Sequence, residues 1–162
     1  MEFATKCIHE IGAADATDAC LGALDAWLVI RDIKTLPLRM EQHQKNAFAI
    51  AKWLQEQPRV QYVLYPGLEN HPGYAINKAQ TTGMISFAVD SAETARQILE
   101  GVKLIKFTES LGGTESLITH TDLTAEECAE KGITDCLLRF STGIEATQDL
   151  IDDLAQAFAA VE

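Results

Sequence analysis

The sequence predicts an α/β fold of the two-layer α+β kind, in which a small mixed β-sheet carries its helices largely on one face. Strand-like and helical apolar patterns alternate along the chain, which is the first observation. The second is length, because 162 residues form one domain with a sizeable core but leave no room for another. An apolar share of 47% and a charged share of 23% are typical of an ordinary folded protein.

Composition also excludes several classes of function. The net charge is −11 and the basic residues are scattered, so no basic stripe can follow a nucleic-acid backbone. The four cysteines show neither a CxxC pairing nor histidines at zinc-ligand spacing; they are Cys7, Cys20, Cys128 and Cys136. We therefore expect reduced thiols and no metal site.

A membrane location is not expected either. No apolar run reaches the roughly 18 residues that a bilayer span requires. Met1-Glu2-Phe3 does not open a signal peptide. The sequence favours a cytoplasmic protein.

The N-terminal third contains an arm and a long helical pattern. Residues 1–20 have no clear period and are expected to form an arm. From about residue 25 to residue 57, apolar residues recur at spacings of three and four: Leu24, Leu28, Ile33, Leu36, Met40, Ala47, Ile50, Ala51 and Leu54. Because proline disrupts a helix interior, Pro37 predicts a kink or break near Thr35-Leu36.

The central third predicts two strands and a helix. Val60 to Leu64 is rich in β-branched and aromatic residues and ends at a Pro-Gly turn, and Met84 to Val89 alternates as a second strand. Ser91-Ala-Glu-Thr94 is a helix-capping pattern. The buried side of the helix that follows is predicted to be Ala92, Ala95, Ile98 and Leu99.

Two further strands and two helices are predicted toward the C-terminus. Residues 104–107 and 136–140 read as short strands, and a helix is expected to begin at Thr124. The last helix, from about Ala146, is predicted to bury Leu150, Ile151, Leu154, Phe158 and Val161. Its acidic residues are predicted to face water: Asp149, Asp152 and Asp153.

Two segments carry the candidate chemistry. Glu109 to His120 reads ESLGGTESLITH, and its two adjacent glycines indicate backbone that serves a ligand or a tight turn. Residues 137–145 read LLRFSTGIE, in which Arg139 interrupts a strand-like run. Because a guanidinium matches a carboxylate or phosphate with two parallel hydrogen bonds, an anionic small molecule is a natural ligand for Arg139. A plain turn and a surface or ion-paired arginine are the alternatives.

In this order, and followed by an amphipathic helix, the two segments resemble the small C-terminal domain of the fold-type I pyridoxal-phosphate enzymes of cysteine and methionine metabolism. That group includes cystathionine γ-synthase, cystathionine β- and γ-lyases and methionine γ-lyase. Tyr65-Pro-Gly-Leu68 and the helical phrase from Asp25 to Asn46 are similar to the family pattern as well. The resemblance implies that residues 21–162 form this small domain, with the large cofactor-binding domain absent.

The resemblance also implies residue roles. Arg139 would bind the α-carboxylate of a sulfur-containing amino-acid substrate, and Ser110 with the backbone around Leu111 would lie near the substrate amine. Thr114 joins them as a substrate-binding residue, although its hydroxyl, like that of Ser116, could instead cap the loop backbone, and that structural role is favoured.

The family's cofactor is pyridoxal phosphate, which a lysine binds covalently. Ala4-Thr5-Lys6 could match the phrase that holds this lysine, but Cys7 follows where relatives have an aromatic residue, so Lys6 is not favoured. We expect no catalytic residue in this chain alone and no cofactor bound by it alone.

Two functions are open. The first is an enzyme part, the substrate-carboxylate half of a transsulfuration carbon-sulfur lyase or γ-synthase of cystathionine and methionine metabolism. The second is a non-catalytic family member that binds or modulates full-length subunits. A homo-oligomer or a complex with a full-length family subunit is the expected assembly.

Overall fold

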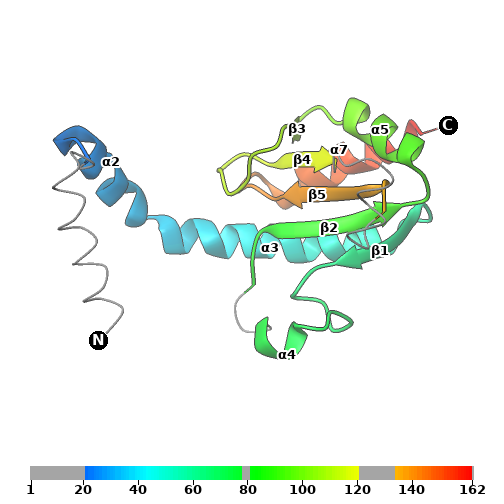
Figure 1. The fold of residues 1–162 in the computed structure, drawn as a ribbon, viewed down its shortest axis with the longest axis horizontal. Helices are drawn as coiled ribbons and strands as arrows, with labels where there is room; N and C mark the ends of the chain where they lie inside the picture. The colour runs from blue at the N-terminus through cyan, green and yellow to red at the C-terminus, as the bar shows by residue number, and fades with distance from the viewer. Residues whose placement is uncertain (1–20, 78–80, 121–133, 162) are drawn as a thin grey trace. The chain divides into compact units, whose positions relative to one another are not determined.

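The computed structural model describes residues 21–77, 81–120 and 134–161, and the chain divides into two compact units, residues 1–37 and 38–162. In the first unit the described element is helix α2, Ala23–Ile33 (Figure 1). None of its residues is buried. The predicted arm, residues 1–20, and the predicted helix beginning at Thr124 lie outside the described residues.

Helix α3, Leu36–Gln55, begins directly after the predicted break. The Thr35 amide donates to the Asp32 carbonyl oxygen at 3.2 Å, which closes the end of α2. Pro37 lies in the first turn of α3, where an amide would have no partner inside the helix, so the proline starts a helix here. The prediction of a break near Thr35-Leu36 is confirmed.

Only the second half of the long helical pattern is buried. Along α3, burial begins at His43 and continues through Asn46, Ala47, Ile50, Ala51 and Leu54. The five earlier apolar positions of the same pattern are all exposed: Leu24, Leu28, Ile33, Leu36 and Met40. The predicted helical spacing was therefore correct, but the apolar positions before His43 are not part of the buried core of the described residues.

The second unit contains a five-stranded mixed sheet with the order β1-β2-β5-β4-β3 (Figure 1). Neighbouring strands are antiparallel except β3 and β4, which are parallel. The strands are β1 Val60–Leu64, β2 Met84–Val89, β3 Lys106–Phe107, β4 Leu117–His120 and β5 Leu137–Ser141. The mixed sheet is confirmed. Strand β4 was not predicted as a separate element, since it lies within the second half of the glycine-containing segment.

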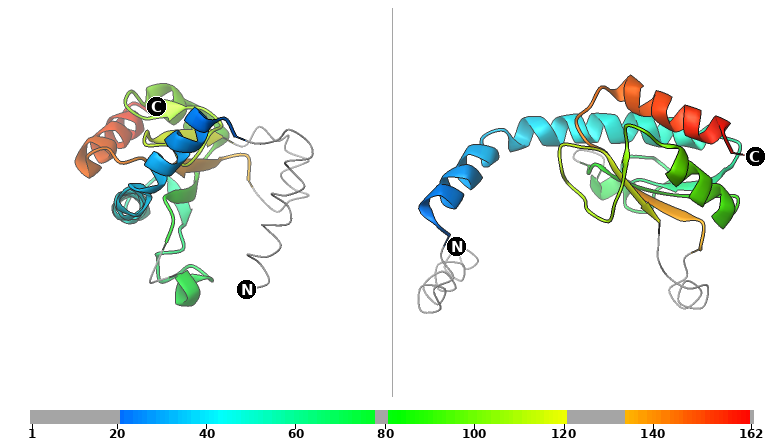
Figure 2. Two further views of the ribbon diagram at one scale, coloured as in Figure 1. Left: turned by 90° about the vertical axis from the view of Figure 1, so that its left-hand side faces the viewer. Right: turned by 90° about the horizontal axis from the view of Figure 1, so that it is seen from above.

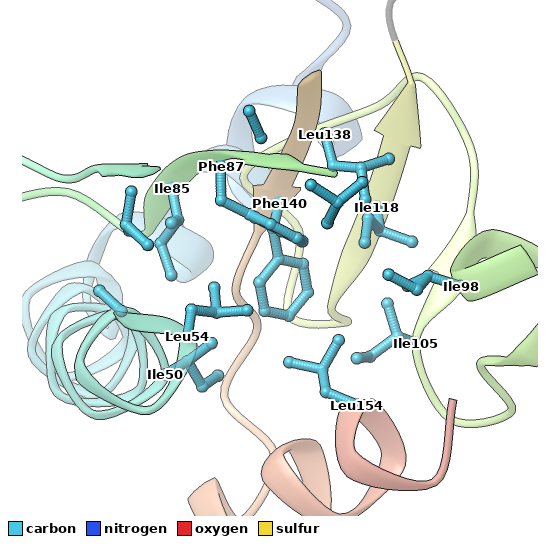
Figure 3. Packing of buried hydrophobic residues seen from close by; sticks show 14 of the residues in the cluster. Ile50, Leu54, Ile85, Phe87, Ile98, Ile105, Ile118, Leu138, Phe140 and Leu154 are labelled. Carbon is cyan, nitrogen blue, oxygen red and sulfur yellow. The ribbon is translucent and has the colours of Figure 1, made fainter. Parts of the chain in front are cut away.

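Three helices cover one face of this sheet (Figure 2). They are α3, α5 (Ala92–Gly101) and α7 (Thr147–Ala159), while α4 is a short helix at Tyr74–Asn77. In the core between helices and sheet (Figure 3), Ile50 and Leu54 of α3, Ile98 of α5 and Leu154 of α7 pack with sheet residues such as Ile85, Phe87, Ile118, Leu138 and Phe140. The predicted two-layer α/β architecture with helices largely on one face is confirmed.

Two details of the predicted helix faces were wrong. Asp153 does not face water: it is 7% exposed and accepts hydrogen bonds from the amides of residues 103–105. Periodicity could not reveal this, because those amides lie between α5 and β3, far away in sequence. Ala92 is exposed in the first turn of α5, and Thr94 is buried instead. Leu150 and Leu154 are fully buried as predicted, and Ile151, Phe158 and Val161 pack partly buried against the core.

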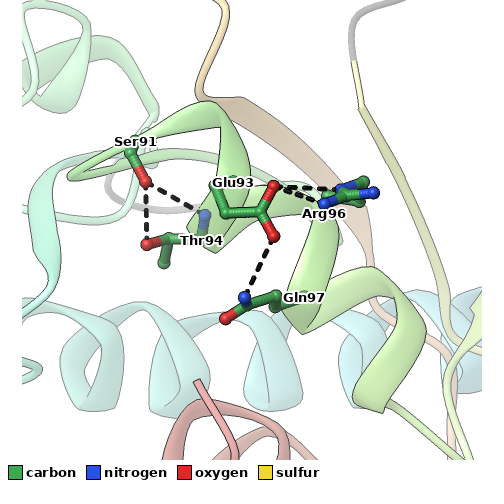
Figure 4. Close-up of polar contacts among 5 residues, drawn as sticks. All are labelled: Ser91, Glu93, Thr94, Arg96 and Gln97. Atoms are coloured by element: carbon green, nitrogen blue, oxygen red, sulfur yellow. Dashed lines mark hydrogen bonds and ion pairs between the residues drawn. The ribbon is translucent and has the colours of Figure 1, made fainter. Parts of the chain in front are cut away.

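The start of α5 offers a test of the predicted cap (Figure 4). The Ser91 hydroxyl oxygen accepts the Thr94 amide at 3.0 Å. We expect Ser91→Ala to lower the free energy of unfolding by about 1 kcal/mol, because a helix amide loses its partner. Ser91→Asp, which can still accept that bond, should lose much less. Urea denaturation measures both, and equal losses would contradict the capping role.

Beside this cap, an exposed ion pair joins Glu93 and Arg96 one turn apart (Figure 4). The hydrogen bond from Arg96 is the main reason why the pKa of the Glu93 carboxyl is lowered, and a bond from Gln97 adds to it. An exposed pair of this kind contributes little to stability. The start of α5 therefore depends on the Ser91 cap more than on this pair.

Candidate functional site

Arg139 lies in the middle of β5, between Ser86 of β2 and Thr119 of β4. Its neighbours Leu138 and Phe140 are fully buried in the core. Because side chains alternate along a strand, Arg139 lies on the sheet face away from that core. It is half-buried, and its Nη2 donates to the Glu109 carbonyl oxygen at 3.0 Å. The structure thus brings the two predicted segments together.

The loop of residues 109–116 is fixed to β5 and to the residues after it by further hydrogen bonds. The Gly112 amide donates to the Ser141 hydroxyl at 3.0 Å. The Ile144 amide donates to the Thr114 carbonyl oxygen at 2.9 Å. Gly112 has a φ of +76°, a left-handed conformation that favours glycine, as its sequence position suggested.

Gly143 marks the closest approach between the two segments. A Cβ at this position would lie 2.4 Å from the Thr114 carbonyl oxygen and 2.3 Å from Oε2 of Glu145. No side chain fits such distances. The glycine after β5 therefore lets the loop backbone approach the strand.

Glu145 is a residue that sequence reasoning did not single out. Its Oε1 accepts the Ser116 amide at 2.6 Å, and its Oε2 accepts the Ser116 hydroxyl at 2.8 Å. Ser116 Oγ in turn accepts the Gly143 amide at 2.8 Å. The structural role favoured for Ser116 agrees with these contacts. An acidic residue directly after a strand-glycine-apolar run was the available signal, but spacing alone does not reveal its partner.

Helix α3 contributes a buried polar group to the same region. His43 and Asn46 are 4% and 0% exposed. The His43 ring contacts the Thr142 carbonyl oxygen through Nδ1 at 2.6 Å, and a carbonyl only accepts, so Nδ1 carries the proton. The Thr142 hydroxyl donates toward the His43 carbonyl oxygen at 3.1 Å and toward the Gly83 carbonyl oxygen at 3.0 Å. The end of β5 is therefore fixed to α3 by side chains as well as by the apolar core.

The remaining predicted site residues lie on this loop and are solvent-exposed. Ser110 directly follows the carbonyl that Arg139 binds, and Leu111 is 55% exposed. The Thr114 hydroxyl donates to Glu115 at 3.3 Å, and the Thr114 carbonyl oxygen accepts the Ile144 amide. Lys6 lies outside the described residues. Arg139 thus binds the loop next to Ser110 and Leu111, whereas the Thr114 hydroxyl binds Glu115.

A surface cleft of about 490 Å³ is a separate feature of the second unit. Its lining includes Phe48 and Lys52 of α3 together with Leu68 and Tyr74. The Lys52 ammonium lies 4.5 Å from the centre of the Phe48 ring, and both side chains are exposed. None of the predicted site residues lines this cleft. In the described ranges, no helix is long and apolar enough to cross a membrane.

Comparisons with known proteins support the family resemblance that these two segments suggested. The family model for Cys/Met metabolism PLP-dependent enzymes matches residues 4–159. A cystathionine gamma-lyase of Dictyostelium discoideum is 47% identical over 82% of this chain and 37% of its own length. A cystathionine gamma-synthase of Haemophilus influenzae is 48% identical over 87% of this chain and 36% of its own length.

Solved structures give the same result. A putative O-acetylhomoserine (thiol)-lyase of Campylobacter jejuni, solved with N'-pyridoxyl-lysine-5'-monophosphate, is 33% identical and has a TM-score of 0.79 over 88% of this chain and 36% of its own. The metB protein of Corynebacterium glutamicum is 40% identical with a TM-score of 0.77, over 86% of this chain and 38% of its own. The chain thus spans well under half the length of these relatives. By sequence and by fold, it belongs to the family of pyridoxal-phosphate-dependent enzymes of cysteine and methionine metabolism.

Proposed function

We propose that residues 21–162 act as the small C-terminal domain of a transsulfuration carbon-sulfur lyase or γ-synthase, and that this domain binds the α-carboxylate of a sulfur-containing amino acid through Arg139. The cofactor-binding domain would come from another part of the protein or from a second chain. Membership of the family supports the class of reaction. The names of the relatives include lyases and a synthase, and the proposal covers both classes.

The proposal rests on the hydrogen bonding of Arg139. Among the described residues, its one polar contact is the bond to the Glu109 carbonyl oxygen. No carboxylate in the described ranges pairs with it, although it is half-buried on the sheet. A guanidinium has five N–H donors, so most remain available for a bidentate bond to a carboxylate.

Several backbone amides near Arg139 are already used within the protein. A phosphate site needs several free donors, usually backbone amides. Four amides of the loop and of the residues after β5 already donate to protein oxygens: Gly112, Ser116, Gly143 and Ile144. These donors fix the loop to β5, and we assign cofactor binding to the other domain.

This assignment predicts that the chain alone forms no stable covalent adduct with pyridoxal phosphate. Visible absorption during a titration, followed by borohydride reduction and peptide mapping, measures it. We expect no more modification at any one lysine than in a denatured control. Specific labelling of Lys6 would contradict the assignment.

A domain graft tests the proposed function itself. Residues 21–162 replace the matching segment of the Haemophilus influenzae cystathionine gamma-synthase, to which the chain is 48% identical. We expect the graft to bind its cofactor and to turn over substrate. A folded graft with bound cofactor but without turnover would contradict the proposal.

Helix α2 favours the second candidate function, association with other family subunits. Its apolar side chains are exposed, including Trp27 at 57%, Ile30 at 57% and Ile33 at 58%. Apolar groups gathered on one exposed helix mark interaction surfaces. Association with other subunits does not require that the chain itself has catalytic activity.

We therefore expect the chain to self-associate at micromolar concentration, and Trp27→Glu with Ile30→Glu to shift it toward the monomer. Sedimentation across a dilution series measures the change. Ile76→Glu is the matched control, because Ile76 is 87% exposed on the separate short helix α4. A monomer at every concentration would count against this surface.

A further inference from the structure

We infer that Glu145 is a positioning residue for the carboxylate site, because its carboxylate fixes the loop of residues 109–116 in the register that Arg139 requires. The inference rests on the proposed function of Arg139. The inference adds Glu145, which lies outside the loop, to the site. Through Asn46 it also links the site to helix α3.

Glu145 holds the C-terminal end of the loop at one residue. Ser116 is fully buried, and both of its donors, the amide and the hydroxyl, bind the Glu145 carboxylate at 2.6 and 2.8 Å. Hydrogen bonds to a charged carboxylate are the stronger kind. Because Ser116 Oγ also accepts the Gly143 amide, Glu145, Ser116 and Gly143 form a closed group of contacts.

Asn46 of α3 holds Glu145 itself in place. Its Nδ2 donates to the backbone carbonyl oxygens of Gly143 and Glu145 at 3.0 and 2.9 Å. Its Oδ1 accepts from Gln42 at 2.9 Å and from Thr147 at 2.6 Å. The fully buried amide therefore uses both its donors and its acceptor. The backbone that carries the Glu145 side chain cannot shift without breaking this group.

The other end of the loop is where Arg139 binds. Its guanidinium contacts the Glu109 carbonyl oxygen, and Ser141 holds Gly112. The loop is thus fixed by Arg139 at its start and by Glu145 at its end. Releasing the Glu145 end lets the Glu109 carbonyl move, which changes the direction of the guanidinium that we propose as the carboxylate ligand.

Amide hydrogen exchange on the chain itself tests the structural step. In Glu145→Ala we expect the Ser116 amide to exchange at least about tenfold faster, the size expected for losing a bond to a charged acceptor. The amides of Ile118 and Phe140 in the sheet should keep their protection. Glu115→Ala is the matched control, since it also removes one carboxylate near Ser116, but that carboxylate accepts its hydrogen bond from the Thr114 hydroxyl and not from Ser116.

A conservative variant covers the case in which Glu145→Ala does not fold. Glu145→Gln has the same shape and keeps a neutral oxygen for the Ser116 amide, so this amide should exchange faster than in the parent and more slowly than in Glu145→Ala. Unchanged protection of Ser116 in Glu145→Gln and in Glu145→Ala would overturn the inference.

The functional step is tested in the grafted enzyme by the KM for the amino acid. Glu145→Ala should raise KM in the presence of Arg139 and have little further effect in Arg139→Ala, because a positioning residue acts through the group that it positions. Independent effects of the two substitutions would overturn the positioning role alone. An Arg139→Ala graft with the KM of the parent would overturn the proposed function, and the exchange experiment would still decide whether Glu145 holds the loop.

Discussion

Replacing Asp153 by alanine is expected to lower the free energy of unfolding by about 3 kcal/mol or more, the largest stability effect that we predict. Its Oδ1 accepts the Lys103 amide at 2.9 Å, and its Oδ2 accepts the amides of Leu104 and Ile105 at 2.9 Å each. The carboxylate is 7% exposed, so water cannot easily replace it. Alanine would leave three backbone donors without this acceptor at the join between α5, α7 and the sheet.

Asp152 supplies the matched control for this substitution. It neighbours Asp153 on α7, is exposed, and binds the side chain of Gln148. Asp152→Ala should change the free energy of unfolding by no more than about 0.5 kcal/mol. Urea denaturation monitored by tryptophan fluorescence compares the two variants. Equal effects would show that the three amide bonds do not matter for stability.

Arg139→Ala in the grafted enzyme is expected to reduce kcat/KM by roughly 30- to 1000-fold, which corresponds to about 2–4 kcal/mol. The physical reason is the loss of a fork of donors for a carboxylate that becomes buried when substrate binds. Steady-state kinetics with the amino-acid substrate measures the change. Arg139→Lys should recover only part of it, because an ammonium keeps the charge without the planar fork.

The controls separate binding from folding. In the chain by itself, Arg139→Ala should leave the urea midpoint nearly unchanged, since the substitution removes one exposed bond to the Glu109 backbone. Arg59→Ala removes a different arginine, which pairs with Asp90 at 3.4 Å. The Arg59 variant should keep the kinetics of the parent. A similar kinetic loss in both variants would mean that general charge, and not Arg139, matters.

Local patterns in the sequence predicted most of the fold because they follow the physical period of each element. Strands β1 and β2 were predicted with their observed bounds, since β1 is rich in β-branched and aromatic residues before a Pro-Gly turn and β2 alternates. The break before Pro37 followed from the chemistry of one residue. The prediction failed where a residue has a hydrogen-bond partner far away in sequence. Asp153 has the spacing of an exposed acid on an amphipathic helix, but it is buried because it accepts the amides of residues 103–105.

The site shows the same limit. Arg139 and the two glycines were visible because each is unusual within its own segment. The group that fixes them was not, because Asn46 bonds the Gly143 carbonyl across 97 residues of sequence. Ser116 and Glu145 are 29 residues apart. Spacing within a segment carries no information about such pairs, so the supporting residues required the structure.

The most direct test of the proposed site compares a substrate with its carboxamide analogue in the grafted enzyme and in its Arg139→Ala variant. The analogue keeps the shape of the amino acid but has no charged carboxylate for the guanidinium to bind. We expect the parent graft to prefer the carboxylate by roughly 30-fold or more, as for a desolvated charge-assisted pair, and the variant to lose nearly all of that preference. A variant that still discriminates between the two compounds as strongly as the parent would contradict the assignment of Arg139 as the carboxylate ligand.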